Sequence, residues 1–129
     1  MKINKKTVII PKTGSKPLGP YSPGIRVGDV VFTSGQIGLD PLTGRLVSGG
    51  LEAETNQALQ NLLEILEAAG SSLSQVVKVT IYIRNIDDYP LVNKIYAEYF
   101  QENPPARAIV EGKLPASASI EIDAIAFVS

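Results

Sequence analysis

The sequence predicts an α+β fold, with one mixed β-sheet of about six strands and two α-helices packed on a single face. Three observations lead to this prediction. Two segments carry apolar residues at helical spacing, and six shorter segments are rich in β-branched residues. These segments follow the order strand, strand, strand, helix, strand, helix, strand, strand. With 129 residues and no internal repeat, the chain has room for one domain, spanning 1–129.

The first three strands are predicted in the N-terminal third of the chain. Thr7–Ile10 is a β-branched run ended by a proline, which is typical of an edge strand. A loop rich in proline and glycine follows over 12–24. The segments 25–27 and 30–37 then flank Gly28-Asp29, a pair that favours the tight turn of a hairpin.

Each predicted helix has one apolar side. Over 51–69 this side consists of leucines and alanines, and Gly70 follows where a left-handed C-cap is favoured. The opposite side, which we expect to face solvent, carries Glu54, Gln57, Gln60, Asn61, Glu64 and Glu67. The second helix begins after a capping Asp87 or Asp88, has Pro90 in its first turn and ends before two consecutive prolines.

Alternation defines the other three strands, Gln75–Arg84, Ala106–Glu111 and Ser119–Val128. In the first of them, one face carries Val77, Val79, Ile81 and Ile83. In the last strand, the side chains predicted to meet the helices are Ile120, Ile122, Ala124, Ala126 and Val128. In the strand between them, we expect the helices to meet Ala106, Ala108 and Val110.

Composition limits the chemistry available to the protein. The chain has no cysteine and no histidine, which excludes disulfides, thiol nucleophiles, Ser-His pairs and the usual zinc sites. Its formal net charge of -1 gives no reason to expect a nucleic-acid partner. Any reaction must therefore use carboxylates, Arg, Lys, Tyr, hydroxyl groups, backbone groups or bound water.

Apolar segments are short throughout the sequence. No run approaches the roughly 20 residues of a membrane span, so we expect no membrane association. The N-terminal apolar stretch is also too short for the core of a secretory signal. These features, with the lack of cysteine, favour a cytoplasmic location.

The strand face left uncovered by the helices combines charges with large apolar groups. On the alternation above it carries Glu121, Asp123, Ile125 and Phe127 of the last strand, and Arg107, Ile109 and Glu111 of the strand before. Subunit association is the simplest cover for such a face. Arg107 then has two interpretations: an interfacial ion pair with a carboxylate, or bidentate binding of an anionic substrate.

Several motifs together resemble the reactive-intermediate deaminase family, also called the YjgF/UK114 or RidA family. They occur in the family's order and cover nearly the whole chain. The motifs are Gly19-Pro20-Tyr21-Ser22-Pro23, Phe32-Thr33-Ser34-Gly35-Gln36-Ile37, Glu67-Ala68-Ala69-Gly70, Asn93, Pro105-Ala106-Arg107-Ala108 and Ile120-Glu121-Ile122-Asp123-Ala124-Ile125-Ala126.

The resemblance implies a chorismate-mutase-like fold assembled as a homotrimer, with active sites in the clefts between subunits. It implies 2-iminobutanoate/2-iminopropanoate deaminase activity, the hydrolysis of reactive enamines and imines such as 2-aminoacrylate to 2-keto acids and ammonia. The implied partner is a small carboxylate substrate, and no metal or organic cofactor is required. Orientation of the substrate and proton transfer through water would supply the catalysis.

Site residues follow from the same resemblance, position by position. Arg107 looks like the family's carboxylate-binding arginine, and Glu121 looks like its water-positioning glutamate. Tyr21, Ser34 and Asn93 match further positions at or beside the pocket. Each of these three also has a structural interpretation: Tyr21 as a cover for a core edge, Ser34 as a hydrogen bonder at a strand end, and Asn93 as a helix-to-loop hydrogen bonder.

This sequence departs from the family pattern in two places. Ile109 stands where better-studied members commonly carry cysteine, so we expect a more apolar pocket wall that thiol oxidation cannot alter. The link from Arg107 to Leu114-Pro115 is one residue shorter than in those members, with Gly112-Lys113 inside it. Either the ends of the two site strands change, or the turn is only tighter.

Two other functions compete with the deaminase interpretation. One is a trimeric binding or regulatory module for small carboxylates, in which Arg107 would serve equally well. The other is an RNA-cleaving translation inhibitor, which the near-neutral charge and the absence of histidine disfavour. Chorismate mutase activity rests on fold analogy alone, which does not establish function.

Overall fold

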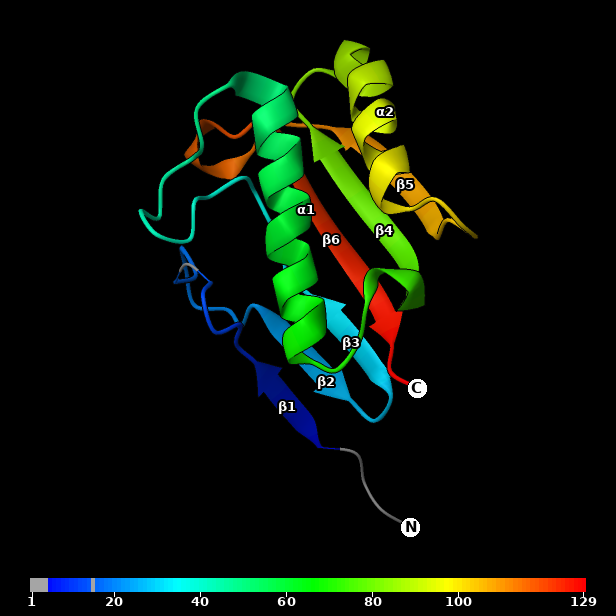
Figure 1. Ribbon diagram of the computed structural model, residues 1–129. Helices are drawn as coiled ribbons and strands as arrows, with labels where there is room; N and C mark the ends of the chain where they lie inside the picture. The colour runs from blue at the N-terminus through cyan, green and yellow to red at the C-terminus, as the bar shows by residue number, and fades with distance from the viewer. Residues whose placement is uncertain (1–4, 15) are drawn as a thin grey trace.

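A six-stranded mixed sheet carries both helices on one face in the computed structural model, which describes residues 5–14 and 16–129 (Figure 1). This is the α+β architecture that the sequence predicts. The strands are β1 (Lys6–Ile9), β2 (Gly24–Val27), β3 (Val30–Thr33), β4 (Val76–Ile83), β5 (Ala106–Glu111) and β6 (Ile120–Phe127). The helices are α1 (Gly50–Ala68) and α2 (Tyr89–Tyr99).

The sheet has the strand order β1-β2-β3-β6-β4-β5. Neighbouring strands are antiparallel except β4 and β5, which are parallel and connected through α2. Parallel neighbours need such a crossover connection, because a tight turn cannot join them. The C-terminal strand β6 therefore lies in the middle of the sheet, and β1 and β5 form its two edges.

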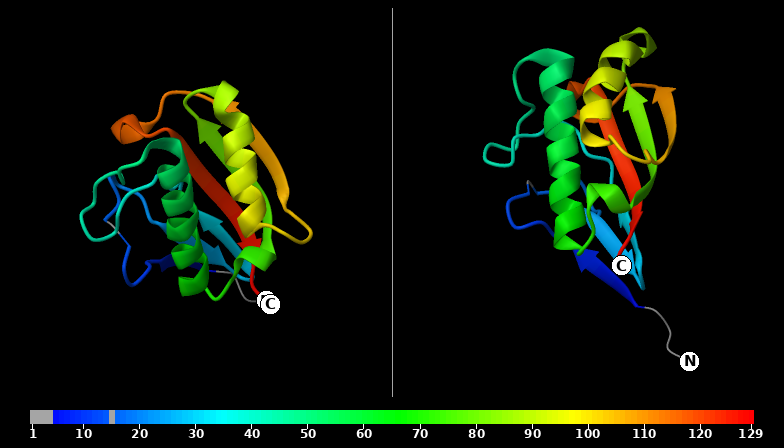
Figure 2. Two further views of the ribbon diagram at one scale, coloured as in Figure 1. Left: turned by 45° about the horizontal axis from the view of Figure 1, so that its top comes forward. Right: turned by 45° about the vertical axis from the view of Figure 1, so that its right-hand side comes forward.

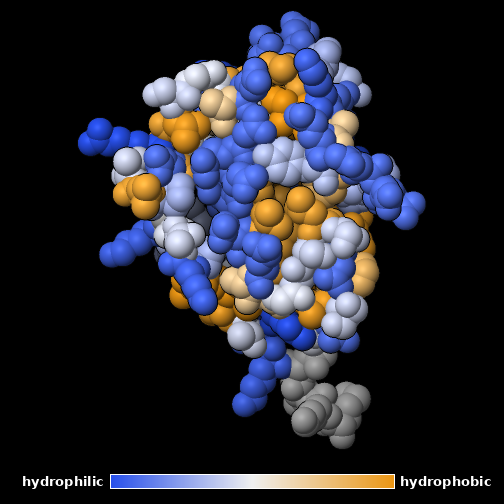
Figure 3. All heavy atoms as spheres, in the orientation of Figure 1, coloured by the Kyte–Doolittle hydropathy of each residue, from blue (hydrophilic) through white to orange (hydrophobic). Residues whose placement is uncertain are grey.

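The core lies between the sheet and the two helices, which cover the same face in every view (Figures 1 and 2). Fully buried side chains come from both layers. They include Leu59, Leu62 and Leu66 of α1, Val92 of α2, and Val31, Val79, Ile81, Ile83, Ile120 and Ile122 of the sheet. The outer side of α1 is mostly hydrophilic, as its amphipathic pattern predicts (Figure 3).

The predicted solvent face of α1 is wrong for two residues. Glu54 is only 6% exposed, and its carboxylate accepts hydrogen bonds from the backbone N–H of Ser119 at 2.8 Å and the Ser119 hydroxyl at 3.2 Å. The Asn61 amide donates to the carbonyls of Ile37 and Leu39. The loops before β6 and after β3 pack against this side of α1, and their polar backbone groups need partners there.

A β-bulge changes the predicted face at the start of β4. The register with β6 shifts between Val76 and Lys78. As a result Val76 is buried, whereas Val77, which the alternation groups with Val79, is about half exposed. A bulge adds one residue to a strand and reverses the side-chain alternation from that point.

The predicted orientation of β5 is also wrong. Its register pairs Arg107 with Val79 and Ile109 with Ile81, and those β4 residues are fully buried beneath the helices. Paired residues on neighbouring strands share a face, so Arg107 and Ile109 lie on the helical side. The open face instead receives the small set, Ala106, Ala108 and Val110. Local apolarity misled the prediction, since β5 is an edge strand that α2 covers only in part.

The end of helix α1 and the first hairpin turn have the backbone conformations that the sequence predicts at their glycines. Gly28 and Gly70 both have positive φ, at 57° and 84°, as expected for a hairpin turn and a helix C-cap. Asp88 occupies the N-cap of α2, but its side chain makes no capping hydrogen bond. The short helical turn before it, Ile86–Asp88, is capped by Asn85, whose side-chain oxygen accepts a hydrogen bond from the Asp87 N–H. Within the described residues, no helix combines the length and apolarity that a membrane span requires.

Candidate active site

The Arg107 side chain, on the edge strand β5, lies over the rings of two tyrosines of α2. Its guanidinium carbon lies 4.8 Å from the ring centroid of Tyr96 and 5.9 Å from that of Tyr89, both within cation–π range. Among residues 5–14 and 16–129, Arg107 has no ion pair and no side-chain hydrogen bond. A rigid guanidinium fork with its donors unused is suited to bidentate binding of a carboxylate.

Two buried polar atoms lie on the same side of α2 as these rings. The side-chain oxygen of Asn93 and the hydroxyl of Tyr96 are both buried, and neither has a hydrogen-bond partner in the part of the chain that the structure describes. Burial raises the pKa of Tyr96 to about 12, although the nearby Arg107 charge acts in the opposite direction. The Tyr96 hydroxyl therefore stays protonated at neutral pH. Buried polar atoms are rarely left unpaired, so this cluster is suited to a polar ligand.

Ile109 lies two residues beyond Arg107 on the same face of β5. It is partly buried and packs against the core cluster. Its aliphatic side chain thus packs on the core near the arginine, and its role as a pocket wall stays a prediction. A shallow pocket next to Arg107 has an apolar lining of Tyr96, Ala97, Phe100, Pro104 and Pro105.

Glu121 lies on the opposite, open face of the sheet, near the point where β3 ends. β3 stops at Thr33 rather than at the predicted residue 37, and beyond it only Gln36 pairs with β6, through Ile122. The Glu121 carboxylate is packed against Gly35, and in the described residues it has no hydrogen-bond or ion-pair partner. Its pKa is raised above the ordinary value by burial first and by Asp123 second.

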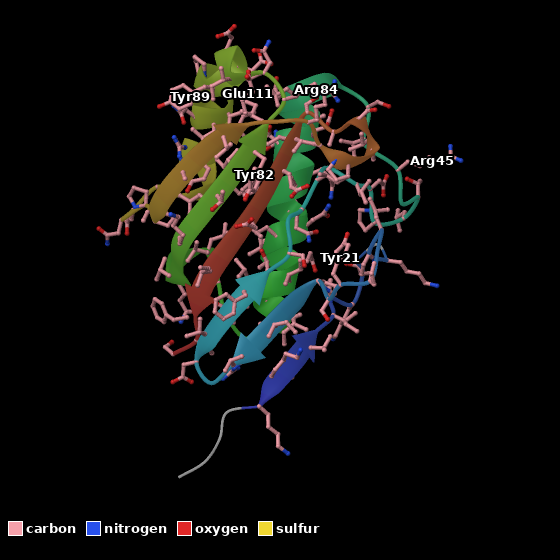
Figure 4. The ribbon with its side chains drawn as sticks, turned by 180° about the vertical axis from the view of Figure 1, so that it is seen from behind. Tyr21, Arg45, Tyr82, Arg84, Tyr89 and Glu111 are labelled. Atoms are coloured by element: carbon pink, nitrogen blue, oxygen red, sulfur yellow. The ribbon has the colours of Figure 1, made fainter. Side chains whose placement is uncertain are left out.

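Tyr21 and Ser34 both lie near the Glu121 side chain. Tyr21 lines the same cleft as Glu121, Gly35 and Gln36, is about half exposed, and its hydroxyl accepts a hydrogen bond from the Leu18 N–H (Figure 4). The Ser34 hydroxyl donates to the Ser22 carbonyl at 2.6 Å. Ser34 therefore connects the end of β3 to the loop before β2. This contact matches its structural interpretation as a hydrogen bonder at a strand end.

The structure separates the predicted site residues into two groups within one chain. Arg107, Asn93 and Ile109 belong to the helical side at β5, whereas Glu121, Tyr21 and Ser34 belong to the open side at β6 and β3. The sheet itself stands between the two groups.

The register gives the scale of this separation. Arg107 pairs with Val79 and Val79 with Ala124, so Glu121 is two strands across and three residues along from Arg107. That spacing places their Cα atoms roughly 14 Å apart, with the two side chains on opposite faces. One small substrate cannot contact both side chains in a single chain.

Sequence reasoning missed three neighbours of these groups. Tyr89 and Tyr96 hold the Arg107 side chain, and Gly35 accommodates Glu121. The tyrosines lie four residues before and three after Asn93, which is the spacing of one helix face, and that spacing could have indicated them. The described residues contain no group of three or more Asp and Glu arranged to hold a metal ion.

Comparison with known proteins shows close relatives over almost the full chain. The Endoribonuclease L-PSP family matches residues 12–128. A RutC family protein of Pyrococcus horikoshii is 48% identical over 95% of this chain and 98% of its own. The human protein named 2-iminobutanoate/2-iminopropanoate deaminase is 48% identical over 84% of this chain and 80% of its own.

Solved structures give the same relationship. RidA from the Antarctic bacterium Psychrobacter superposes with a TM-score of 0.91 at 34% identity, covering 95% of this chain and 99% of the other. The YjgF gene product of E. coli superposes with a TM-score of 0.87 at 37% identity, covering 94% and 98%. The chain therefore belongs to the Endoribonuclease L-PSP family, the YjgF/RidA proteins that its motifs resemble.

Proposed function

We propose that the protein is a 2-iminobutanoate/2-iminopropanoate deaminase, which hydrolyses small 2-imino acids and their enamine tautomers to 2-keto acids and ammonia. The observation that carries this proposal is the Arg107 guanidinium, which lies over two tyrosine rings and has no ion pair within the described residues. The same helix carries two buried polar atoms that lack hydrogen-bond partners among those residues. The human and mouse relatives, at 48% and 47% identity, are both named 2-iminobutanoate/2-iminopropanoate deaminase, which supports the same substrate class.

The proposed reaction needs no strong nucleophile. Arg107 binds the substrate carboxylate and so fixes the protonated imine carbon, which is already electrophilic. Water attacks this carbon while the Glu121 carboxylate accepts one water proton, giving an amino alcohol. That proton passes to the amino group, and the C–N bond breaks while the Glu121 carboxylate takes the hydroxyl proton and the C=O bond of the keto acid forms. The departing ammonia then takes this proton from Glu121 and leaves as ammonium. Together, the cationic imine and one water give the keto acid and ammonium.

Such a reaction requires residues from two copies of the chain. Because Arg107 and Glu121 lie on opposite faces of the sheet, we propose a homotrimer whose sites combine Arg107 of one copy with Glu121 of the next. The open face supports association, since it exposes large apolar side chains that a neighbouring copy would bury. They are Val8, Val30, Phe32, Val110 and Phe127.

The deaminase activity is tested by generating 2-aminoacrylate in situ with a dehydratase and following formation of the keto acid. Wild type should accelerate hydrolysis above the buffer rate. Arg107→Ala should lose about 100-fold in kcat/KM, since losing a charge-assisted carboxylate contact costs about 3 kcal/mol. Arg45→Ala, a change to an exposed loop arginine, serves as the matched control and should keep full activity. No acceleration by wild type would refute the enzyme proposal.

The shared site is tested by mixing two inactive variants. Arg107→Ala and Glu121→Ala chains are coexpressed with different tags, and mixed assemblies are purified. In every mixed trimer, one interface of three combines an intact Arg107 with an intact Glu121, so about a third of wild-type activity should return. If both residues acted within one chain, no mixed assembly would contain an intact site and none would return.

The competing functions give different results in the same preparations. A carboxylate-binding module would bind 2-keto acids, with binding lost in Arg107→Ala, yet would leave 2-aminoacrylate hydrolysis at the buffer rate. The family name Endoribonuclease L-PSP suggests RNA cleavage instead. A protein with that activity would degrade a labelled RNA, and the Arg107 or Glu121 substitution would reduce the cleavage.

A further inference from the structure

The Glu121 carboxylate is packed against Gly35, in the space that a side chain at this position would occupy. A Cβ built at Gly35 would lie 2.2 Å from the Glu121 Oε2, 2.6 Å from its Cδ and 2.8 Å from its Cγ. These distances are far inside van der Waals contact, so no side chain fits while Glu121 keeps its position. The φ angle of Gly35 is not in the left-handed region, so its backbone conformation does not by itself require glycine.

The backbone on both sides of Gly35 is fixed. The Ser34 N–H donates to the Pro23 carbonyl at 2.8 Å, and the Ser34 hydroxyl donates to Ser22. Gln36 and Ile122 exchange two backbone hydrogen bonds, at 2.8 and 2.9 Å. A side chain added at Gly35 would therefore displace the carboxylate, because moving the backbone would break these hydrogen bonds.

We propose that Gly35 is a positioning residue for Glu121: its missing side chain leaves the space in which the carboxylate lies against the backbone and faces the cleft. This inference rests on the proposed deaminase function, in which Glu121 holds the attacking water. Gly35 does not touch the reacting atoms in this proposal. It acts only through the position of Glu121.

The consequence for kinetics is specific. In the proposed site, Arg107 comes from a neighbouring copy and binds the carboxylate of the substrate, whereas the atoms nearest to a Cβ at Gly35 all belong to Glu121 of the same chain. A displaced Glu121 loses its water geometry but leaves that binding intact. Gly35→Ala should therefore lower kcat by about tenfold or more while KM changes by less than about twofold.

Gly112→Ala is the matched control, because a Cβ at Gly112 meets no heavy atom within 4 Å and its φ is not positive. That variant should keep wild-type kcat and KM. Circular dichroism and light scattering establish that both variants fold and assemble as wild type does.

A double-mutant cycle on stability separates this role from a general packing role. Gly35→Ala should destabilise the protein to urea when Glu121 is present, and should have little effect in a Glu121→Ala background, where the displaced side chain is gone. An equal loss in both backgrounds would overturn the proposal, as would a raised KM with unchanged kcat, which would indicate steric exclusion of substrate. Inactive wild type would instead refute the deaminase function itself.

Discussion

At the scale of single residues, the environment of Glu121 predicts a pH dependence. Its pKa is raised by burial and then by the charge of Asp123, and the carboxylate form is the one that holds water. A raised pKa means that protonation begins at a higher pH than for an exposed glutamate. The kcat of hydrolysis should therefore fall on acidification, with a midpoint above the usual value of about 4.3.

Asp123→Asn provides the check on this prediction. The substitution removes the neighbouring negative charge, so the midpoint of the kcat profile should move to lower pH. Tyr82 also faces Glu121 across the strands, on the open side of the sheet (Figure 4). A profile that does not change in Asp123→Asn would mean that another group controls the acid limb.

The sequence selected candidate residues for the site, but it predicted their arrangement wrongly. Arg107 and Glu121 were selected by motif, and each has an environment suited to its proposed role, with an unpaired cation over aromatic rings and a carboxylate in a cleft. Alternation placed both on one face, however, and that was wrong. The face of Arg107 depends on the parallel register of β5 with β4, which involves contacts distant in sequence that local apolarity does not encode.

At the scale of elements, one side of α2 contacts Arg107 and another side packs into the core. Two of its tyrosines lead to stability predictions of opposite sign. The Tyr96 hydroxyl is buried and has no hydrogen-bond partner among the residues described, so Tyr96→Phe should stabilise the ligand-free protein by about 1 kcal/mol. The Tyr99 hydroxyl donates to Asn56 at 2.9 Å, so Tyr99→Phe should destabilise it by a similar amount.

Urea unfolding at one fixed protein concentration measures both changes, since an oligomer's apparent stability depends on concentration. The opposite signs are the diagnostic feature. Destabilisation by Tyr96→Phe would mean that its hydroxyl has a partner in solution.

Helix α1 fixes the approach to β6 through Glu54. Glu54→Ala removes the acceptor for the Ser119 N–H and hydroxyl and leaves a buried donor unpaired, so we expect a loss of about 2–3 kcal/mol in the free energy of unfolding. Glu67→Ala, on the exposed side of the same helix, should change it by less than about 0.5 kcal/mol. Equal effects from the two substitutions in urea unfolding would contradict the assigned role.

The same helix shows why element boundaries were easier to predict than faces. The leucine spacing and Gly70 locate α1 within one residue at each end, because propensity and capping are local properties. Glu54 looks like a solvent-facing residue in that local pattern. Its burial depends on the loop before β6, which packs against α1 from 65 residues away in sequence. Local pattern cannot specify that contact.

At the scale of the whole molecule, two features lead to one prediction about assembly. The candidate site residues lie on opposite faces of the sheet, and the open face exposes large apolar side chains. Phe32 is 44% exposed on the open face, paired with Ile25 on one side and Ile125 on the other. In an isolated chain, Phe32→Glu would place a charge at a position already reached by water, with little cost. In the proposed trimer the same charge would be buried without a partner, which costs several kcal/mol.

Phe32→Glu should therefore lower the molecular mass measured by light scattering and abolish deaminase activity together, because a separated chain keeps Arg107 and Glu121 on opposite faces. Leu42→Glu is the matched control: Leu42 is 92% exposed on a loop, and its substitution should leave mass and activity as in wild type. Full activity from a Phe32→Glu monomer would show that one chain is enough for catalysis. Arg107 and Glu121 would then not act on the same substrate molecule, and the shared site would be refuted.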